Sequence, residues 1–482
     1  MITPKVLTKL ITPKVVAGPR VGVVVGGGSI VATILIGLLG PSAMVPPLRG
    51  PSWQPPYSLG VAPDGHLVIA LAAAAIVLGA IGLAIGLRHA CRMPPARWLL
   101  LAGCLAAVVL AFLPPSGSAD HLNYAAYGRM VMLGHNPYVT VPADLPGDPV
   151  IGAVEEWGTV PSVYGPVATA VQALASFVGG DSLRLTIFVM AIVNAAAFIA
   201  TALVLHRFTR HDPVRQRRAA LLWTANPLII YHLAAGMHLD TLAIAFMVAA
   251  LVVARGKGIL LGLGIAVKVT AGLVALGPAW ELRRSPRRLA VVAGSALLTV
   301  VVAYLLAGPD SLDQVRSASQ SLSLATPWKL VQHAAQALFG PGAYRVWIQL
   351  GSYALLAALA VMVLRALRAD GPLDAPRVAL AFAVAWLFAT PYVLPWYDGL
   401  AFALLALAAC PALEAFMIVR LAVLSLGYLP ARQADQPPDL GWLVSVVRSQ
   451  VVPWCLLALT VLLGWWAWKT SKAAGRAPTR SA

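Results

Sequence analysis

The sequence predicts an all-α polytopic membrane protein with about 12–14 transmembrane or half-membrane helices, judged by how many apolar runs approach spanning length. Hydrophobic residues make up 59% of the 482 positions, compared with roughly 45–50% in soluble domains. The mean hydropathy is +0.80. The apolar runs approach the roughly 20 residues that a helix needs to cross a bilayer, and none alternates with the ~10-residue dyad pattern of a membrane barrel.

The charge pattern orients these helices. The formal net charge is +17, but the Lys and Arg residues stand in short clusters beside apolar runs rather than along one stripe. This distribution is typical of the positive-inside rule, which places the clusters in the cytoplasm, and it argues against a nucleic-acid partner. The four cysteines are scattered without the spacing of a metal site or a disulfide framework.

The first helices are expected at 21–40, 67–87 and 98–113, with basic residues before the first and between the second and third. The basic N-terminus and first apolar run superficially imitate a secretory signal, but the run is long and no clear cleavage site follows, so we interpret it as a retained helix. A cytoplasmic N-terminus then puts the polar loop 114–163 outside.

The middle of the chain needs two helices that do not cross fully. Residues 185–205 form an apolar run that ends in an arginine-rich segment, which belongs in the cytoplasm. The helix after Pro166 should therefore enter from outside without completing a crossing, unless a loop elsewhere is misplaced. Helices at 219–236 and 238–254 follow. The segment 257–282 is flanked on both sides by basic clusters, which favours a half-depth hairpin over a single crossing.

The rest of the chain supplies further helices and two external loops. The expected helices are 288–307, 346–366, 376–393, 397–410, 411–427 and 450–467, and the expected loops are 308–345 and 428–449. We divide the chain into a cytoplasmic tail (1–20), a transmembrane core (21–395), C-terminal transmembrane helices (396–467) and a basic cytoplasmic tail (468–482).

The first candidate site is "SADHLNYAAYGRMVMLGHNPY", residues 118–138, where polar and ionisable residues are concentrated in a largely apolar sequence. At 100° per residue, Asn123, Tyr124 and Tyr127 project to the same side as Asp120. The apolar residues on the other side are Leu122, Ala125, Ala126 and Leu133. We therefore expect an amphipathic helix resting on the outer membrane surface. Asp120 is either a helix cap or a general base that accepts a proton from a sugar hydroxyl.

Ionisable groups inside apolar segments supply the second and third candidates. "NPLIIYHLAAGMHLDTLAIAF" carries His232, His238 and Asp240, and "GIAVKVTAGLV" carries Lys268. Such groups are costly at membrane depth and indicate function by default, although the hairpin turn could simply be wetted by headgroups. Lys268 could hold a phosphate or extend to the cytoplasmic surface. His238 and Asp240 without a further ligand do not make a zinc site.

Aromatic and basic residues on the same external side complete the candidates. "ATPYVLPWYDGLAF" carries Trp396, Tyr397 and Asp398, which are either membrane-belt residues or a sugar-facing surface. The loop before residue 345 adds Arg316, Trp328, Lys329 and His333, of which the cations could clamp a lipid phosphate. Neither a Walker-type loop nor a hydrolase elbow is present.

The order of these blocks resembles a known class. The external loop that opens with an aspartate, "YAAYGRMVMLGHNPY", "SVYGP", the long block containing "HLDTLAIAF" and "AVKVTAGL", and "PYVLPWY" are similar to GT-C glycosyltransferases. They look most like the actinobacterial α-1,6-mannosyltransferases that build the lipomannan and lipoarabinomannan backbone, from about residue 20 to residue 400. The chain departs from the family pattern at His121, Leu122 and Asn123, and again at Leu239.

The resemblance implies an inverting, metal-independent transfer of mannose from polyprenyl-phosphate-mannose to a lipid-anchored mannan. The plasma membrane would hold the enzyme with its active site facing outside, without a cofactor. Asp120 would be the catalytic base, and the departing phosphate would meet Lys268, Arg316 or Arg129. The predicted substrate-binding residues are His121, Tyr124, Arg129, Asn136, Tyr138, Tyr164, His238, Asp240, Lys268, Arg316, Trp328, Trp396 and Tyr397.

Two alternatives stay open at this point. The same carrier could deliver another sugar, such as arabinofuranose. A lipid-glycan flippase or transporter would also use broken helices and buried charge, although no inverted repeat is visible in the sequence.

Overall fold

The computed structural model describes residues 18–313 and 321–474, and all regular secondary structure in these ranges is helical. Seven segments of this described part are long and apolar enough to cross a membrane. They are α2 (Pro19–Leu39), α3 (Gly65–Arg88), α7 (Leu183–Phe208), α13 (Pro286–Ala307), α16 (Arg345–Ala369), α19 (Pro411–Tyr428) and the C-terminal segment Pro438–Ala473, which contains α20 (Val452–Ala474). The chain is therefore an all-α polytopic membrane protein, as the sequence predicts.

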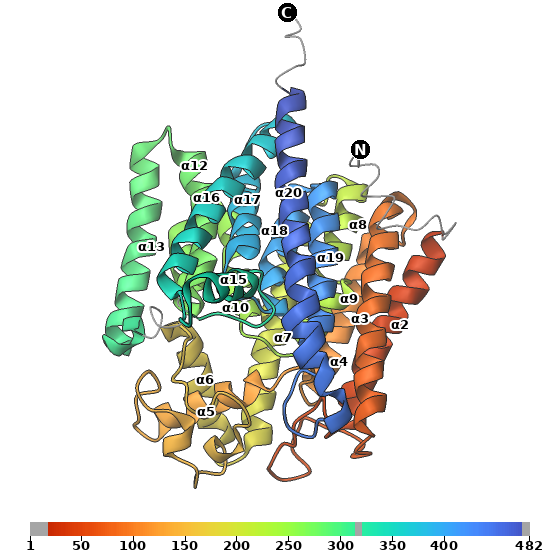
Figure 1. The fold of residues 1–482 in the computed structure, drawn as a ribbon, viewed down its shortest axis with the longest axis vertical. Coiled ribbons are helices and arrows are strands. Elements are labelled where there is room, and N and C mark those ends of the chain that lie inside the picture. Colours follow the sequence, from red (N-terminus) through yellow and green to blue (C-terminus); the bar gives the residue numbers. More distant parts are fainter. Residues whose placement is uncertain (1–17, 314–320, 475–482) are drawn as a thin grey trace, which may run out of the picture.

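Shorter apolar helices fill the space between the long ones (Figure 1). Several are interrupted by a turn of 3₁₀ or π-helix, so that an apolar segment of spanning length is divided into pieces. They are α4 (Ala96–Ala111), α6 (Pro166–Gly179), α10 (Asp240–Val252), α11 (Lys257–Val267), η5 (Val269–Ala275) with α12 (Leu276–Leu282), α17 (Ala375–Ala389), and η6 (Pro395–Asp398) with α18 (Gly399–Ala408).

The two ends of the molecule differ in charge. The start of α2, the helix α8 (Pro213–Leu222) and the last turn of α20 lie at the upper end in Figure 1, whereas α5 (Asp120–Met132) lies at the lower end. The arginines of α8 contact the junction between α3 and α4, where Arg217 donates to the Cys91 carbonyl at 2.9 Å and Arg218 to the Leu87 carbonyl at 3.0 Å. Basic clusters thus gather at the end opposite α5.

The early helix boundaries match the sequence prediction within two residues, but the helix expected at 219–236 is wrong. The chain breaks after α8, and Asn226 caps a new start by accepting hydrogen bonds from Leu228 N at 3.1 Å and Ile229 N at 3.3 Å. The helix then continues through α9 (Pro227–Ile229) and the π-helical η4 (Ile230–Ala235). Pro227 cannot donate to the preceding turn, so it begins a helix rather than extending one.

The segment 257–282 is a hairpin, as its flanking charges predict. Lys257 at the start of α11 pairs with Glu281 near the end of α12, with Nζ 3.3 Å from Oε2. The two arms therefore enter and leave at the same end of the molecule. The helix breaks at Lys268, whose backbone is extended (φ −153°, ψ 115°), and resumes as η5.

Helix α6 has 14 residues, which corresponds to about 21 Å of helix against a hydrocarbon core of about 30 Å. It begins beside the hairpin, where Gly165 N donates to the Val267 carbonyl at 3.0 Å, and it ends next to the start of α7, where Gly179 approaches Thr186. Its length is that of the incomplete crossing predicted after Pro166.

The prediction that α5 rests on the membrane surface is wrong. Leu122, Ala125 and Ala126, which were assigned to the lipid side, are buried at 1% exposure or less, and Leu133 just beyond the helix is exposed. Helix α5 packs closely against α6 and against the loop that follows it, so both of its sides are covered by protein. Tertiary packing, not a lipid surface, takes up its apolar residues.

The two later loops contain helices that the sequence prediction did not include. Helix α15 (Trp328–Phe339) occupies part of 308–345, and the π-helical η8 (Leu443–Val451) occupies the end of the loop expected at 428–449. Helix α17 ends at Ala389, earlier than expected, because Pro391 disfavours helical backbone at the residue before it.

Candidate active site

Polar and aromatic side chains from five separate segments meet in one central polar cluster. They come from the start of α5, the loop before α6, the turn that leads into the first residue of α10, the break between α11 and η5, and η6. The cluster is made of Asp120, Tyr124, Tyr164, His238, Asp240, Lys268, Trp396 and Tyr397.

Asp120 is the carboxylate of the cluster without a strong cationic partner. Within the described ranges, no Lys or Arg nitrogen lies within 4.0 Å of it, and its Oδ2 faces His238 Nδ1 at 3.7 Å. The side chain keeps 15% of its surface exposed. Burial raises the pKa of Asp120 to about 7, helped by the negative charges of Glu156 and Asp240 and opposed by Lys268. Such a carboxyl can exchange a proton near neutral pH.

Asp120 is not the helix cap of α5. Ala119 holds that position, and the helix has no side-chain cap hydrogen bond at its N-terminus. Instead, Asp120 N donates to Ser118 Oγ at 3.1 Å. The Asp120 side chain therefore does not serve as the cap, and its carboxylate faces the cluster.

His238 connects Asp120 to the aromatic side of the cluster. Its ring stacks on Trp396 with centroids 3.7 Å apart and planes 13° apart, and its Nδ1 lies 3.3 Å from the Tyr124 hydroxyl. The turn that presents His238 requires Gly236, because a Cβ there would lie 2.3 Å from the His232 carbonyl oxygen. With 1% of its side chain exposed, His238 orients its neighbours rather than meeting solvent.

Lys268 forms the cationic side of the cluster. Its Nζ lies 2.5 Å from Asp240 Oδ1 and 3.8 Å from the centroid of the Tyr397 ring. The ammonium therefore does not extend to the basic end of the molecule. Its side chain is 17% exposed, and Asp240 Oδ2 is buried without a hydrogen-bond partner among the described residues. A charged pair with spare hydrogen-bonding capacity can accept a further polar ligand.

Tyr164 reaches the cluster because the loop before α6 docks tightly on the hairpin. A Cβ at Gly165 would lie 2.2 Å from the Ala266 carbonyl oxygen, so only glycine allows this approach. The Tyr164 hydroxyl is 2.9 Å from that of Tyr124, and the two rings meet edge to face with centroids 5.0 Å apart. The motif "SVYGP" thus positions a hydroxyl through its following glycine.

Three predicted site residues of the external loop region have other partners, and a fourth, His121, has neither ring nitrogen hydrogen-bonded among the described residues. His121 is fully buried, and burial together with the charge of Arg432 lowers its pKa to about 3. Arg129 pairs with Asp148 at 2.8 Å and Asp181 at 2.5 Å, so it does not point toward lipid. Asn136 Nδ2 donates to Asp310 Oδ2 at 2.8 Å, and the Tyr138 hydroxyl is 2.9 Å from Thr169 Oγ1. The contacts of Arg129, Asn136 and Tyr138 hold the first external loop in place.

The predicted site residues of the later external segment also lie apart from the cluster or outside the described ranges. Arg316 falls within 314–320, outside the described residues. Trp328 Nε1 donates to the Ala389 carbonyl at 2.7 Å, and Lys329 Nζ donates to Gln332 at 2.9 Å. Trp328 therefore fastens the start of α15 to the end of α17.

Two buried arginines were missed by the sequence interpretation. Arg420 lies in an apolar run of α19 and pairs with Asp398, which is fully buried rather than a belt residue. Arg432, in the loop after α19, pairs with Glu155 of the first external loop. The charge inside an apolar run was a usable signal for Arg420, whereas a loop arginine such as Arg432 has no local signal.

The fold and the cluster together describe a multi-span helical membrane protein. Its polar site holds a paired cation and a carboxylate that has no Lys or Arg partner among the described residues. A family model described as "Alpha-(1->6)-mannopyranosyltransferase, N-terminal domain" matches residues 24–284, more than half of the chain. The chain belongs to this alpha-(1->6)-mannopyranosyltransferase family. The matched region contains Asp120, Tyr164, His238, Asp240 and Lys268.

Curated relatives match over shorter stretches. The chain is 26% identical over 171 residues to alpha-(1->6)-mannopyranosyltransferase A of Corynebacterium glutamicum, covering 34% of this chain and 35% of the relative. It is 28% identical over 169 residues to the B protein of the same species, covering 34% and 26%. The A protein of Mycobacterium tuberculosis is 25% identical over 164 residues, covering 33% and 32%. The alignments thus span about a third or less of each relative. No solved structure matches the chain.

Proposed function

We propose that this protein transfers mannose in α-1,6 linkage from polyprenyl-phosphate-mannose to a lipid-anchored mannan at the outer face of the plasma membrane. The family supports mannosyl transfer. The observation that carries the proposed site is the contrast within the cluster between Asp120, which has no Lys or Arg partner in the described ranges, and Lys268, held 2.5 Å from Asp240.

The proposed reaction is a direct displacement with inversion that needs no metal or cofactor. Asp120 accepts the proton of the acceptor hydroxyl as its oxygen attacks the anomeric carbon of mannose. The bond from that carbon to the phosphate oxygen breaks, and polyprenyl phosphate leaves with the electron pair. The Lys268 ammonium offsets the negative charge that develops on this phosphate.

The proposed orientation follows from the charge distribution. The basic clusters lie at the end opposite α5, as the positive-inside rule expects for a cytoplasmic end. The end that carries α5 and Asp120 would then face outward. A lipid-carried donor and a lipid-anchored acceptor would both reach the cluster from that side of the membrane.

The test is a transfer assay with the purified full-length protein, radiolabelled polyprenyl-phosphate-mannose and a lipid-linked mannoside acceptor. We expect wild-type transfer, and a loss of roughly 10²–10⁴-fold in Asp120→Asn, because an amide cannot accept the proton. Asp144→Asn is the matched control, since Asp144 is an exposed aspartate of the same loop that accepts a hydrogen bond from Val141 N. It should transfer at the wild-type rate.

Other outcomes contradict parts of the proposal. Equal transfer by Asp120→Asn and wild type would exclude Asp120 as the base. Transfer from polyprenyl-phosphate-arabinofuranose but not from the mannose donor would show that the donor assignment is wrong. Movement of lipid-linked glycan across a vesicle membrane, without transfer of any sugar, would replace the enzyme with a transporter.

A further inference from the structure

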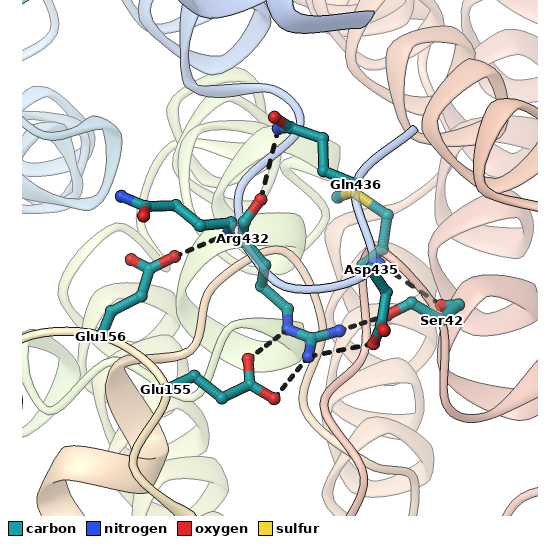
Figure 2. Close-up of polar contacts among 8 residues, drawn as sticks. Ser42, Glu155, Glu156, Arg432, Asp435 and Gln436 are labelled. Carbon is teal, nitrogen blue, oxygen red and sulfur yellow. Dashed lines mark hydrogen bonds and ion pairs between the residues drawn. The ribbon is translucent and has the colours of Figure 1, made fainter. Parts of the chain in front are cut away.

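A buried arginine joins three segments that are far apart in the sequence. Arg432 has no exposed side-chain surface, and its Nε and Nη2 donate to the two carboxylate oxygens of Glu155 at 2.8 Å and 2.5 Å. Its Nη1 donates to the Ser42 carbonyl. Figure 2 shows the guanidinium between Glu155 and Ser42, with Asp435 beside it at 3.6 Å.

Glu156, the residue after Glu155, connects the loop after α19 to α5. The Glu156 carboxylate accepts a hydrogen bond from Gln433 N at 2.8 Å, and the Glu156 carbonyl accepts one from Asn123 Nδ2 at 3.0 Å. Asn123 lies one turn after Asp120 in α5. The pair Glu155–Glu156 is therefore held between the loop after α19 and the first turn of the helix that carries Asp120.

We propose that Arg432 is a positioning residue of the proposed active site, which fixes Glu155 and Glu156 against the first turn of α5 and so sets the place of Asp120. The inference rests on the proposed function, in which Asp120 is the base. Arg432 lies outside the matched residues 24–284, so the site is completed by the C-terminal part of the chain. A planar guanidinium suits this task because two of its nitrogens donate parallel hydrogen bonds to the two carboxylate oxygens, an arrangement that a single ammonium nitrogen does not offer.

The position of Glu156 affects the proton affinity of Asp120. Its negative charge and the burial of the site both raise the pKa of Asp120. If the segment moves away, the charge departs and water enters, and both changes lower this pKa. Within the described ranges, the other charged and titratable groups that interact with Asp120 are His238, Asp240, Lys268, Tyr124, Tyr127, Tyr164, Tyr392, Tyr397 and Tyr428.

The test compares Arg432→Lys with Arg218→Lys. Arg218 is a matched control at the opposite end, because it also binds one carboxylate, that of Glu414, and one backbone carbonyl, that of Leu87 at 3.0 Å. Both variants keep the positive charge but lose the planar guanidinium and its several N–H donors. In Arg432→Lys we expect kcat for mannose transfer to fall on the order of tenfold with a smaller change in KM, because a displaced base slows the chemical step.

The pH profile and hydrogen exchange separate positioning from a general loss of stability. In Arg432→Lys the midpoint of the acidic limb of kcat/KM should move to lower pH, and amide exchange should rise in residues 150–160. Arg218→Lys should leave both unchanged. Glu155→Gln should reproduce the Arg432→Lys effects, and combining the two substitutions should add little, because both remove the same contact.

The outcomes separate this inference from the proposed function. If wild type transfers mannose and Arg432→Lys matches Arg218→Lys in kcat, pH midpoint and exchange, the positioning role is wrong. If wild type transfers no mannose, the proposed function fails, and the exchange data alone decide whether Arg432 holds the segment. Exchange in 150–160 equal to that of wild type would then overturn the inference.

Discussion

Two aspartates of the central polar cluster have the same local setting and different partners. Asp120 is the first residue of α5 and Asp240 the first residue of α10; each helix has 13 residues, and in neither does the N-cap side chain make a capping hydrogen bond. Asp240 lies 2.5 Å from the Lys268 ammonium, whereas Asp120 faces His238 at 3.7 Å. The difference is tertiary, because the sequence around each residue predicts a similar helix start.

This comparison assigns different chemistry to the two carboxylates. One oxygen of the Asp240 carboxylate already contacts the Lys268 ammonium at 2.5 Å. A partly buried carboxylate without such a partner exchanges its proton more readily near neutral pH. In the proposed reaction, proton transfer therefore falls to Asp120, and Asp240 holds the cation.

Among substitutions in the Asp240–Lys268 pair, Lys268→Met should cause the largest loss of transfer. The change removes the proposed phosphate partner and leaves the Asp240 carboxylate without its ammonium. We expect kcat/KM for mannose transfer to fall by roughly 10²–10³-fold, similar to the loss of one transition-state donor. The measurement is steady-state transfer by the purified variant.

Lys257→Met is the matched control for that variant. Lys257 begins the same hairpin and also pairs with a carboxylate, Glu281 at 3.3 Å, but at the other end of α11. Its transfer rate should stay near that of wild type. Equal losses in the two variants would show that the hairpin, not the Lys268 charge, is what transfer requires.

Asp240→Asn should have a smaller effect than Lys268→Met. The ammonium remains available to a phosphate but loses the carboxylate that places it, so we expect a loss on the order of tenfold. The double variant Asp240→Asn with Lys268→Met should lose little more than Lys268→Met alone, because the residues act as one unit. A loss in Asp240→Asn as large as in Asp120→Asn would reverse the assignment of the two aspartates.

The pH dependence of transfer should show the smallest effect, because the midpoint of the pH profile shifts while activity is kept. Because the pKa of Asp120 is raised to about 7, kcat/KM should rise with pH up to about 7 and then level off, since the base works only when deprotonated. Glu156→Gln removes a charge that raises this pKa, so the midpoint should move to lower pH. A wild-type pH midpoint near the ordinary pKa of an aspartate would contradict the raised pKa of Asp120.

Much of the fold could be predicted because membrane helices are specified locally. Apolar length and basic flanks placed α2, α3 and α7 close to their observed bounds, and the same flanks predicted the hairpin that Lys257 and Glu281 close. The errors fall where local signals compete. Pro227 divides an apolar run, and the apolar side of α5 is covered by protein where its pattern predicted lipid.

The candidate site was predicted in part. The sequence pointed to Asp120, His238, Asp240 and Lys268 because each is an ionisable residue in or beside an apolar segment, and the structure brings the four together. It also pointed to Arg129, which instead pairs with Asp148 and Asp181. A single helix pattern does not reveal which distant carboxylate will neutralise an arginine.

The sequence by itself determined that this chain crosses a membrane as helices, which end is basic and which segments carry ionisable groups, because transfer into lipid depends on local composition. Only the tertiary structure decided how those groups pair. Lys268 meets Asp240 across 28 residues, Tyr124 meets His238 across 114, and Arg432 meets Glu155 across 277. Such contacts follow from the packing of whole helices, and they leave Asp120 as the aspartate without a Lys or Arg partner in the described part of the cluster.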